Sequence, residues 1–179
     1  MYGEEAVTGI KEAIREKAQT AGFDATGFAM AADDGTPGAH LAAFLAQGLH
    51  GDMGWMARTA ERRASPQALW AEARSVVVLG ASYAPTNDPL ASLDRRDCAT
   101  VSVYARGRDY HNVLKKRLKG LARWMAETYA CDVKVFVDTA PVMEKPLAAR
   151  AGVGWQGKHT NLVSRRFGSW LFLGEVFTT

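Results

Sequence analysis

Asp138 is the residue whose type and position best suit acid–base chemistry. It follows an alternating apolar run, Val133–Val137, and stands just before Pro141, so we expect it at the end of a strand. An aspartate placed there can be partly desolvated, which raises its pKa and keeps it a proton donor near neutral pH. The same residue could instead cap a following helix, for which Thr139 is a second candidate. The residues alone leave both interpretations open.

A dense group of polar and aromatic residues follows another predicted strand, Thr100–Tyr104. Segments that follow strands are common places for ligand contacts, because the sheet holds them rigidly. His111 could equally be an ordinary histidine in the first turn of the next helix. The group comprises Tyr104, Arg106, Arg108, Asp109, Tyr110 and His111.

The glycine-rich segment Gly152–Lys158 matches two nucleotide-binding patterns, G-x-G-x-x-G and GxxxxGK, and we reject both. The first needs a strand before it and a helix after it, whereas here a helical segment comes first and Thr160–Ser164 resembles a strand. The second needs Ser or Thr where His159 stands. What remains is a backbone that can approach a large flat ligand, with Trp155 facing it, or else a plain tight turn.

Basic residues are concentrated in one part of the chain, although the net charge is only +3. Residues 1–57 carry eight acids and three bases, whereas residues 95–123 carry nine bases and two acids. Such a segment suits a polyanion, because neutralised phosphates release counterions, but it could also be a solvated helix face. Its candidate nucleic-acid contacts are Arg106, Arg108, Lys115 and Lys119.

The composition is that of one globular domain over residues 1–179, with 47% hydrophobic and 23% charged residues. No apolar run reaches the length of a membrane span and no signal peptide is evident, so we expect a cytoplasmic protein without a membrane partner. Cys98 and Cys131 stand far apart, which predicts free, buried thiols and no metal ligand set.

Hydrophobic periodicity predicts an α/β sandwich, of the α+β kind, in which helices flank a mixed central sheet. We expect the last two strands to form a hairpin around Phe167-Gly168, and Asp109 to cap the long helix of residues 110–129. The expected helices cover residues 7–21, 40–49, 55–63, a short turn after Ser65-Pro66, 110–129 and 141–151. The expected strands cover residues 23–29, 75–83, 100–104, 133–137, 161–164 and 170–177.

Several segments together resemble the epoxyqueuosine reductase family. The resemblance spans essentially the whole chain and is densest from Tyr104 onward, which makes it far more specific than any short motif. It is carried by Tyr104–His111, Asp138–Pro141, Glu144–Gly152, Gly154–Trp155, Gly157–Leu162 and Gly168–Glu175.

The resemblance implies an enzyme that uses cobalamin and two [4Fe-4S] clusters to reduce epoxyqueuosine, at the wobble position of tRNA, to queuosine. It implies a nitroreductase-like catalytic domain that binds the corrinoid base-off, with the strand-end Asp138 as proton donor. An external electron donor and a monomeric state are further expectations. The cofactor contacts that it implies are Arg63, Tyr104, Asp138, Arg150, Trp155, Gly157, Lys158, Asn161 and Ser164.

The chain departs from the family pattern at Thr179, where a cysteine-rich, ferredoxin-like region would follow. Two isolated cysteines cannot supply one four-iron cluster, so we expect the cluster domain to be absent and this part to be inactive alone. Two alternatives remain: a flavin-dependent, nitroreductase-like oxidoreductase, and a non-catalytic RNA-binding module.

Overall fold

Four strands form the central sheet, in the order β1-β2-β6-β3. A computed structural model describes residues 4–179, and residues 1–3 lie outside the described part. The strands are β1 (Ala25–Met30), β2 (Ser75–Ser82), β3 (Val133–Phe136) and β6 (Leu171–Thr178). Every neighbouring pair among them is antiparallel.

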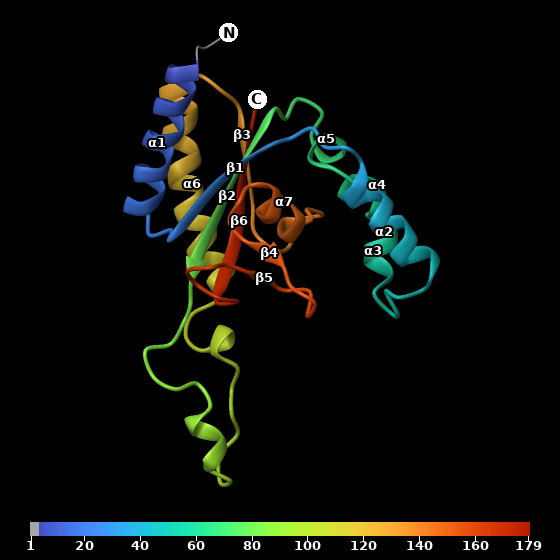
Figure 1. Cartoon of the computed structure of the whole chain (residues 1–179), viewed down its shortest axis with the longest axis vertical. Coiled ribbons are helices and arrows are strands. Elements are labelled where there is room, and N and C mark those ends of the chain that lie inside the picture. Colours follow the sequence, from blue (N-terminus) through green and yellow to red (C-terminus); the bar gives the residue numbers. More distant parts are fainter. Residues whose placement is uncertain (1–3) are drawn as a thin grey trace.

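This pairing corrects the expectation of a mixed sheet. The helix α6 (Tyr110–Tyr129) crosses over between β2 and β3, which therefore run parallel to each other. They are not neighbours, because β6 lies between them and is antiparallel to both. The expected layers of helices around a central sheet are confirmed (Figure 1).

Two apolar layers hold the helices against the sheet. On one face, α1 (Glu4–Thr20) and α6 pack against Val77, Leu79 and Val176. On the other face, α7 (Glu144–Arg150) packs against Val76, Val78 and their neighbours. Successive residues of β2 thus enter opposite layers, as the period of a strand buried on both faces requires. The predicted stripe of α6 is confirmed as buried: Leu114, Leu118, Leu121 and Met125.

Four short helices connect β1 to β2 beside the sheet (Figure 1). They are α2 (Thr36–Ala46), α3 (Gly54–Arg58), α4 (Ala60–Arg63) and α5 (Pro66–Leu69). Ser65 caps α5 as predicted, since its hydroxyl accepts the N–H of Ala68 at 3.0 Å. Within residues 4–179, no helix is both long and apolar enough to cross a bilayer.

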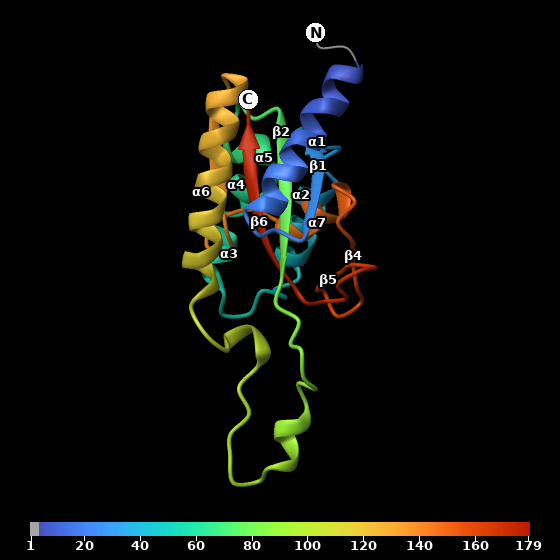
Figure 2. The ribbon, with the colours of Figure 1, turned by 90° about the vertical axis from the view of Figure 1, so that its left-hand side faces the viewer.

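The connection from β2 to α6 projects well beyond the end of the sheet (Figures 1 and 2). It contains two short 3-10 turns, Ala91–Asp94 and Val103–Ala105. The strand expected over Thr100–Tyr104 is therefore wrong, because this part of the chain has no neighbouring strand with which to pair. Cys98 is exposed on the same projection and Cys131 is half-buried, so the prediction of buried thiols is also wrong.

The two strands predicted at the end of the sequence do not pair along their length, although Ser164 and Gly168 form an isolated antiparallel bridge at the predicted turn. Instead β5 (Leu162–Val163) pairs with β4 (Trp155–Gln156), and β6 leaves to complete the central sheet. Gly154 permits this small hairpin, because a Cβ there would stand 2.3 Å from the carbonyl oxygen of Val163. The hairpin holds the glycine-rich segment beside α7.

Candidate active site

Asp138 occupies a tight turn directly after β3. Its φ is +50°, a left-handed conformation that Asp and Asn adopt more readily than most residues. The N–H of Thr139 donates to the carbonyl of Val137 at 2.5 Å across the turn. Neither Asp138 nor Thr139 caps a helix, because α7 starts only at Glu144 and its N-cap is Met143. The helix-cap interpretation is therefore wrong.

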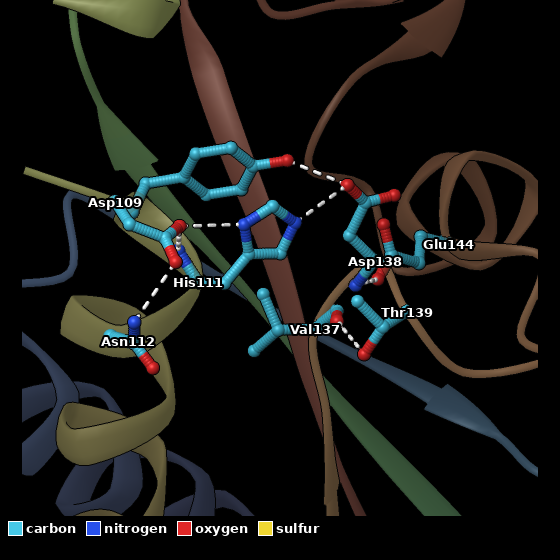
Figure 3. A network of polar contacts seen from close by, with 8 residues as sticks. Asp109, His111, Asn112, Val137, Asp138, Thr139 and Glu144 are labelled. Atoms are coloured by element: carbon cyan, nitrogen blue, oxygen red, sulfur yellow. Dashed lines mark hydrogen bonds and ion pairs between the residues drawn. The ribbon is translucent and has the colours of Figure 1, made fainter.

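Two side chains from the first turn of α6 contact the Asp138 carboxylate (Figure 3). The Tyr110 hydroxyl donates to Oδ2 at 2.6 Å, and Nε2 of His111 lies 3.0 Å from the same oxygen. The other oxygen points away from the His111 ring. The Asp138 side chain is 56% exposed, so this second oxygen can reach a ligand.

His111 bridges two carboxylates. Its Nδ1 lies 2.7 Å from Oδ1 of Asp109, while its Nε2 faces Asp138. Asp109 is also the predicted N-cap of α6, since Oδ1 accepts the backbone N–H of His111 at 2.9 Å. Asn112 donates to the second oxygen of Asp109 at 2.9 Å. Asp109 thus holds the imidazole of His111 between its own carboxylate and that of Asp138.

Aromatic stacking fixes Tyr110 in place. Its ring lies parallel to that of Phe172 on β6, with centroids 4.0 Å apart and planes inclined by 5°. The ring of Tyr83 stacks on Phe172 as well, with centroids 4.3 Å apart. Stacked rings of this kind contribute beyond the area that they bury. The sheet therefore positions the hydroxyl that contacts Asp138.

The electrostatics of the cluster reverse one expectation. The hydrogen bond from Tyr110, followed by that from His111, holds the pKa of Asp138 below its usual value, although burial acts in the opposite direction. The hydrogen bond to Asp109 raises the pKa of His111. Burial and the bond to Asp138 raise the pKa of Tyr110. Asp138 is thus an acceptor in the free protein, and His111 is the group that favours a proton.

The glycine-rich segment lies on the Asp138 side of α7. Lys145 contributes to the lowered pKa of Asp138, and its Nζ lies 3.5 Å from Oδ1 of Asn161. The carbonyl of Asn161 accepts the N–H of Gly157 at 2.8 Å. Trp155 is 48% exposed, and Lys158, three residues further along the chain, is also exposed. The structure thus links Asp138 to Asn161 through Lys145.

Arg63 and Arg150 line the same small cavity, which α7 also borders. Arg63 donates to the carbonyl of Val142 at 3.3 Å, and its guanidinium lies 5.1 Å from the ring centroid of Trp55. Arg150 donates to the carbonyls of Met30 and Ala32 at 2.8 and 2.7 Å. Both arginines join the segment around α2–α5 to the rest of the fold.

Two further predicted contacts lie apart from Asp138. Ser164 is buried, and its hydroxyl accepts the N–H of Arg166 at 3.4 Å. Tyr104 is 55% exposed and stands on the projecting connection.

The candidate nucleic-acid contacts fall into two groups. Lys115 and Lys119 lie on the exposed face of α6, where they line a shallow depression with Lys116 and Arg123. Arg106 and Arg108 are exposed near the end of the projecting connection, and Arg106 donates to the carbonyl of Val101 at 2.8 Å. Their role in binding stays a prediction.

Sequence reasoning left four residues out of the expected site. Tyr110 and His111 belonged to the noted polar group, and the predicted cap at Asp109 already placed them in the first turn of a helix. Glu175 carried a weaker signal, which was an acid within the apolar run Leu171–Phe177. Its place beside β3 depends on the order of the strands, which local patterns do not reveal, whereas Glu144 contacts the Asp138 turn from six residues further along the chain.

The layered sheet and the hydrogen-bonded cluster of Asp109, Tyr110, His111 and Asp138 define an α/β domain with a candidate site for acid–base chemistry. A family model described as "Epoxyqueuosine reductase QueG, DUF1730" matches residues 63–139. The epoxyqueuosine reductase of Xanthomonas campestris pv. campestris is 44% identical over 170 residues, which cover 92% of this chain and 47% of that protein. The corresponding enzyme of Escherichia coli K12 is 42% identical over 138 residues, with 76% and 36% covered.

Solved structures agree with these relatives. An epoxyqueuosine reductase crystallised with a tRNA-Tyr epoxyqueuosine-modified stem loop superposes with a TM-score of 0.79 at 26% identity, covering 96% of this chain and 46% of that one. The Streptococcus thermophilus enzyme gives a TM-score of 0.76 at 26% identity, with 94% and 45% covered. Over almost its whole length the chain is similar to epoxyqueuosine reductases, which are oxidoreductases. It spans about half the length of the curated relatives that it matches.

Proposed function

We propose that this chain is the cobalamin-binding catalytic part of an epoxyqueuosine reductase, which reduces epoxyqueuosine at the wobble position of tRNA to queuosine. The observation that carries the proposal is the Asp138 carboxylate, held on one oxygen by Tyr110 and His111 and exposed on the other. The similarity to epoxyqueuosine reductases supports the proposed reduction. A structure solved with a modified tRNA stem loop supports the substrate.

The reaction consumes two electrons and two protons for each epoxide, whose oxygen leaves as water while a carbon–carbon double bond forms. A corrinoid bound base-off supplies reducing electrons at the epoxide. Asp138 delivers a proton through its exposed oxygen. When a ligand covers this oxygen and excludes water, desolvation raises the pKa of Asp138. A proton held by the imidazole of His111 then passes to the Asp138 carboxylate. Asp109 then stabilises the orientation of the ring.

The side chains present are compatible with a corrinoid. The exposed rings of Trp155 and Tyr104 offer apolar faces to a flat macrocycle. The proposed contacts are Arg63, Tyr104, Asp138, Arg150, Trp155, Gly157, Lys158, Asn161 and Ser164.

The two [4Fe-4S] clusters do not fit the described residues. Cys98 lies on the projecting connection, whereas Cys131 follows α6 and contacts the carbonyl of Met125. The proposal therefore assigns the clusters to a region outside residues 1–179. It includes an external electron donor, a monomer and a cytoplasmic location.

The first test is a titration of the 179-residue protein with cob(II)alamin, followed by visible absorption and electron paramagnetic resonance. We expect saturable binding with a base-off spectrum. Asp138→Asn should keep this affinity within about threefold, because Asn suits the same turn, and should abolish turnover in the full-length enzyme. Asp132→Asn, which changes an exposed aspartate before β3, is the matched control. Normal turnover of Asp138→Asn would refute the assignment.

Neither alternative function gains support from the relatives. A flavin-dependent reductase would be purified yellow and would take up no corrinoid. A non-catalytic RNA-binding module would bind RNA in a salt-sensitive manner and take up no cofactor, and it would leave the Asp109–His111–Asp138 line unexplained.

A further inference from the structure

Glu175 is a carboxylic acid buried in the middle of the central sheet. It lies on β6, opposite Val78 of β2 and Phe136 of β3, and 0% of the residue is exposed. Neither of its carboxyl oxygens has a hydrogen-bond partner among the described residues. Because a buried carboxylate without partners is strongly disfavoured, this position calls for a neutral, protonated side chain.

Glu144 connects this region to the Asp138 turn. It is the first residue of α7, and its Oε1 accepts the backbone N–H of Asp138 at 2.5 Å (Figure 3). Glu175 shares its face of β6 with Leu173 and Phe177, which is the face that α7 covers. Each of the two carboxyl groups shifts the pKa of the other, and the turn of Asp138 contacts Glu144 through its backbone N–H.

The charges around the pair decide which carboxyl ionises. Glu144 faces Asp138 and Glu175, but also the basic groups of His111 from α6 and Arg63 from α4. Burial raises the pKa of Glu144 to about 7. The pKa of Glu175 is raised well above its usual value, first by burial and then by the charges of Glu144 and Asp138. Glu144 therefore ionises first, while Glu175 keeps its proton.

We propose that Glu144 is a positioning residue for Asp138, supported from beneath by a protonated Glu175. The Glu144 carboxylate accepts the Asp138 N–H and so stabilises the left-handed turn. Neither Glu175 oxygen bonds to Glu144 in the structure, and the proposal is that the protonated Glu175 carboxyl turns to donate to the Glu144 carboxylate and so keeps it in place. The turn in turn directs the Asp138 carboxylate toward Tyr110 and His111. This inference rests on the proposed role of Asp138 in proton delivery, but its test does not depend on turnover.

The Asp138 amide resonance of the ¹⁵N-labelled 179-residue protein, followed against pH, tests the inference. In the wild type we expect a downfield amide proton with a titration step near pH 7, where Glu144 ionises. Glu144→Gln should abolish this step yet keep a downfield shift, because its amide oxygen can still accept. Glu144→Leu should lose both. Glu127→Gln, on the exposed side of α6, should match the wild type.

Substitutions at Glu175 test the support. Glu175→Gln keeps a donor and should leave the titration step of Glu144 in place, whereas Glu175→Leu removes the donor and should move the step to higher pH. The ¹³C carboxyl resonance of Glu175 in the wild type should show no titration near the usual value of 4.5, and this measurement decides the matter if Glu175→Leu does not fold. A Glu175 that ionises near 4.5, or an Asp138 amide step that survives Glu144→Gln, would overturn the inference. Both outcomes are independent of corrinoid binding, so they separate this inference from the proposed function.

Discussion

The hydroxyl of Tyr110 lies 2.6 Å from Oδ2 of Asp138, although the two residues are 28 positions apart. Tyr110 stands in the first turn of α6 and Asp138 lies two residues beyond the end of β3, so the contact forms only when the helix packs on the sheet. The stacking of Tyr110 on Phe172 of β6 positions the Tyr110 hydroxyl relative to the sheet. The protonation state of Asp138 therefore depends on the packing of three elements.

Tyr110→Phe should raise the pKa of Asp138, because it removes the largest influence that favours the carboxylate. The ring can still stack on Phe172, so we expect the free energy of unfolding to fall by only about 1 kcal/mol. The Asp138 ¹³C carboxyl shift, followed against pH, measures the change. The control is Tyr83→Phe, which removes a hydroxyl from the same aromatic stack. The Tyr83 hydroxyl contacts the carbonyl of Ser169 and not Asp138, so this variant should leave the pKa of Asp138 unchanged.

His111→Gln should flatten the pH dependence of stability above about pH 6.5. The folded protein raises the pKa of His111, mainly through Asp109, so the stabilisation is complete below the unfolded pKa. It is lost as the pH rises through the folded pKa. Urea denaturation at pH 6 and pH 9 should therefore show a smaller fall for His111→Gln than for the wild type, because the variant keeps only the fall that Glu175 causes. An equal fall in both proteins would contradict the ionic link between His111 and its carboxylates.

Glu175→Gln should make the protein more stable at pH 8 than the wild type. The unfolded chain releases the Glu175 proton above pH 4.5 whereas the folded chain retains it, so wild-type stability falls as the pH rises. The neutral amide lacks this loss, and the two proteins should converge toward pH 4.5. Urea denaturation across this range measures the difference, with exposed Glu127→Gln as the control. A destabilised Glu175→Gln at pH 8 would show that the carboxyl is ionised in the fold.

Gly154→Ala should destabilise the protein by about 2–4 kcal/mol, because the new methyl group would collide with the backbone of Val163. Gly120→Ala is the matched control. Gly120 lies on the exposed side of α6 with open space around it, and alanine there should stabilise the helix by about 1 kcal/mol. Thermal denaturation of the two variants should shift Tm in opposite directions. A neutral Gly154→Ala would show that β4 and β5 can separate at little cost.

Lys115→Ala combined with Lys119→Ala should weaken binding of an anticodon stem loop. If both lysines contact phosphates, the slope of log K against log salt should become shallower by about one for each. Fluorescence anisotropy at several salt concentrations measures both quantities. Lys11→Ala removes one positive charge from exposed α1, and it should leave the slope unchanged. A similar effect of Lys11→Ala would mean that only the net charge matters.

Local patterns predicted the elements with strong periodicity. The stripe of α6, its cap at Asp109 and the apolar run of β2 were all correct, because each depends on neighbours within a few residues. The errors concern long-range pairing, since Thr100–Tyr104 has strand-like residues but no partner strand, and β6 leaves β5 to join the central sheet. The expected rise in the pKa of Asp138 was wrong for the same reason. That direction depends on side chains from α6.

The position of β6 between β2 and β3 has a consequence for synthesis on the ribosome. Among the described strands β6 is translated last, yet it pairs with two of the other three strands of the central sheet. Until residues 171–178 leave the exit tunnel, β3 has no strand to pair with and the apolar layers on both faces stay open. Chaperones that shield unpaired strand edges therefore have most to bind just before this segment emerges, and a pause in translation there prolongs the exposure.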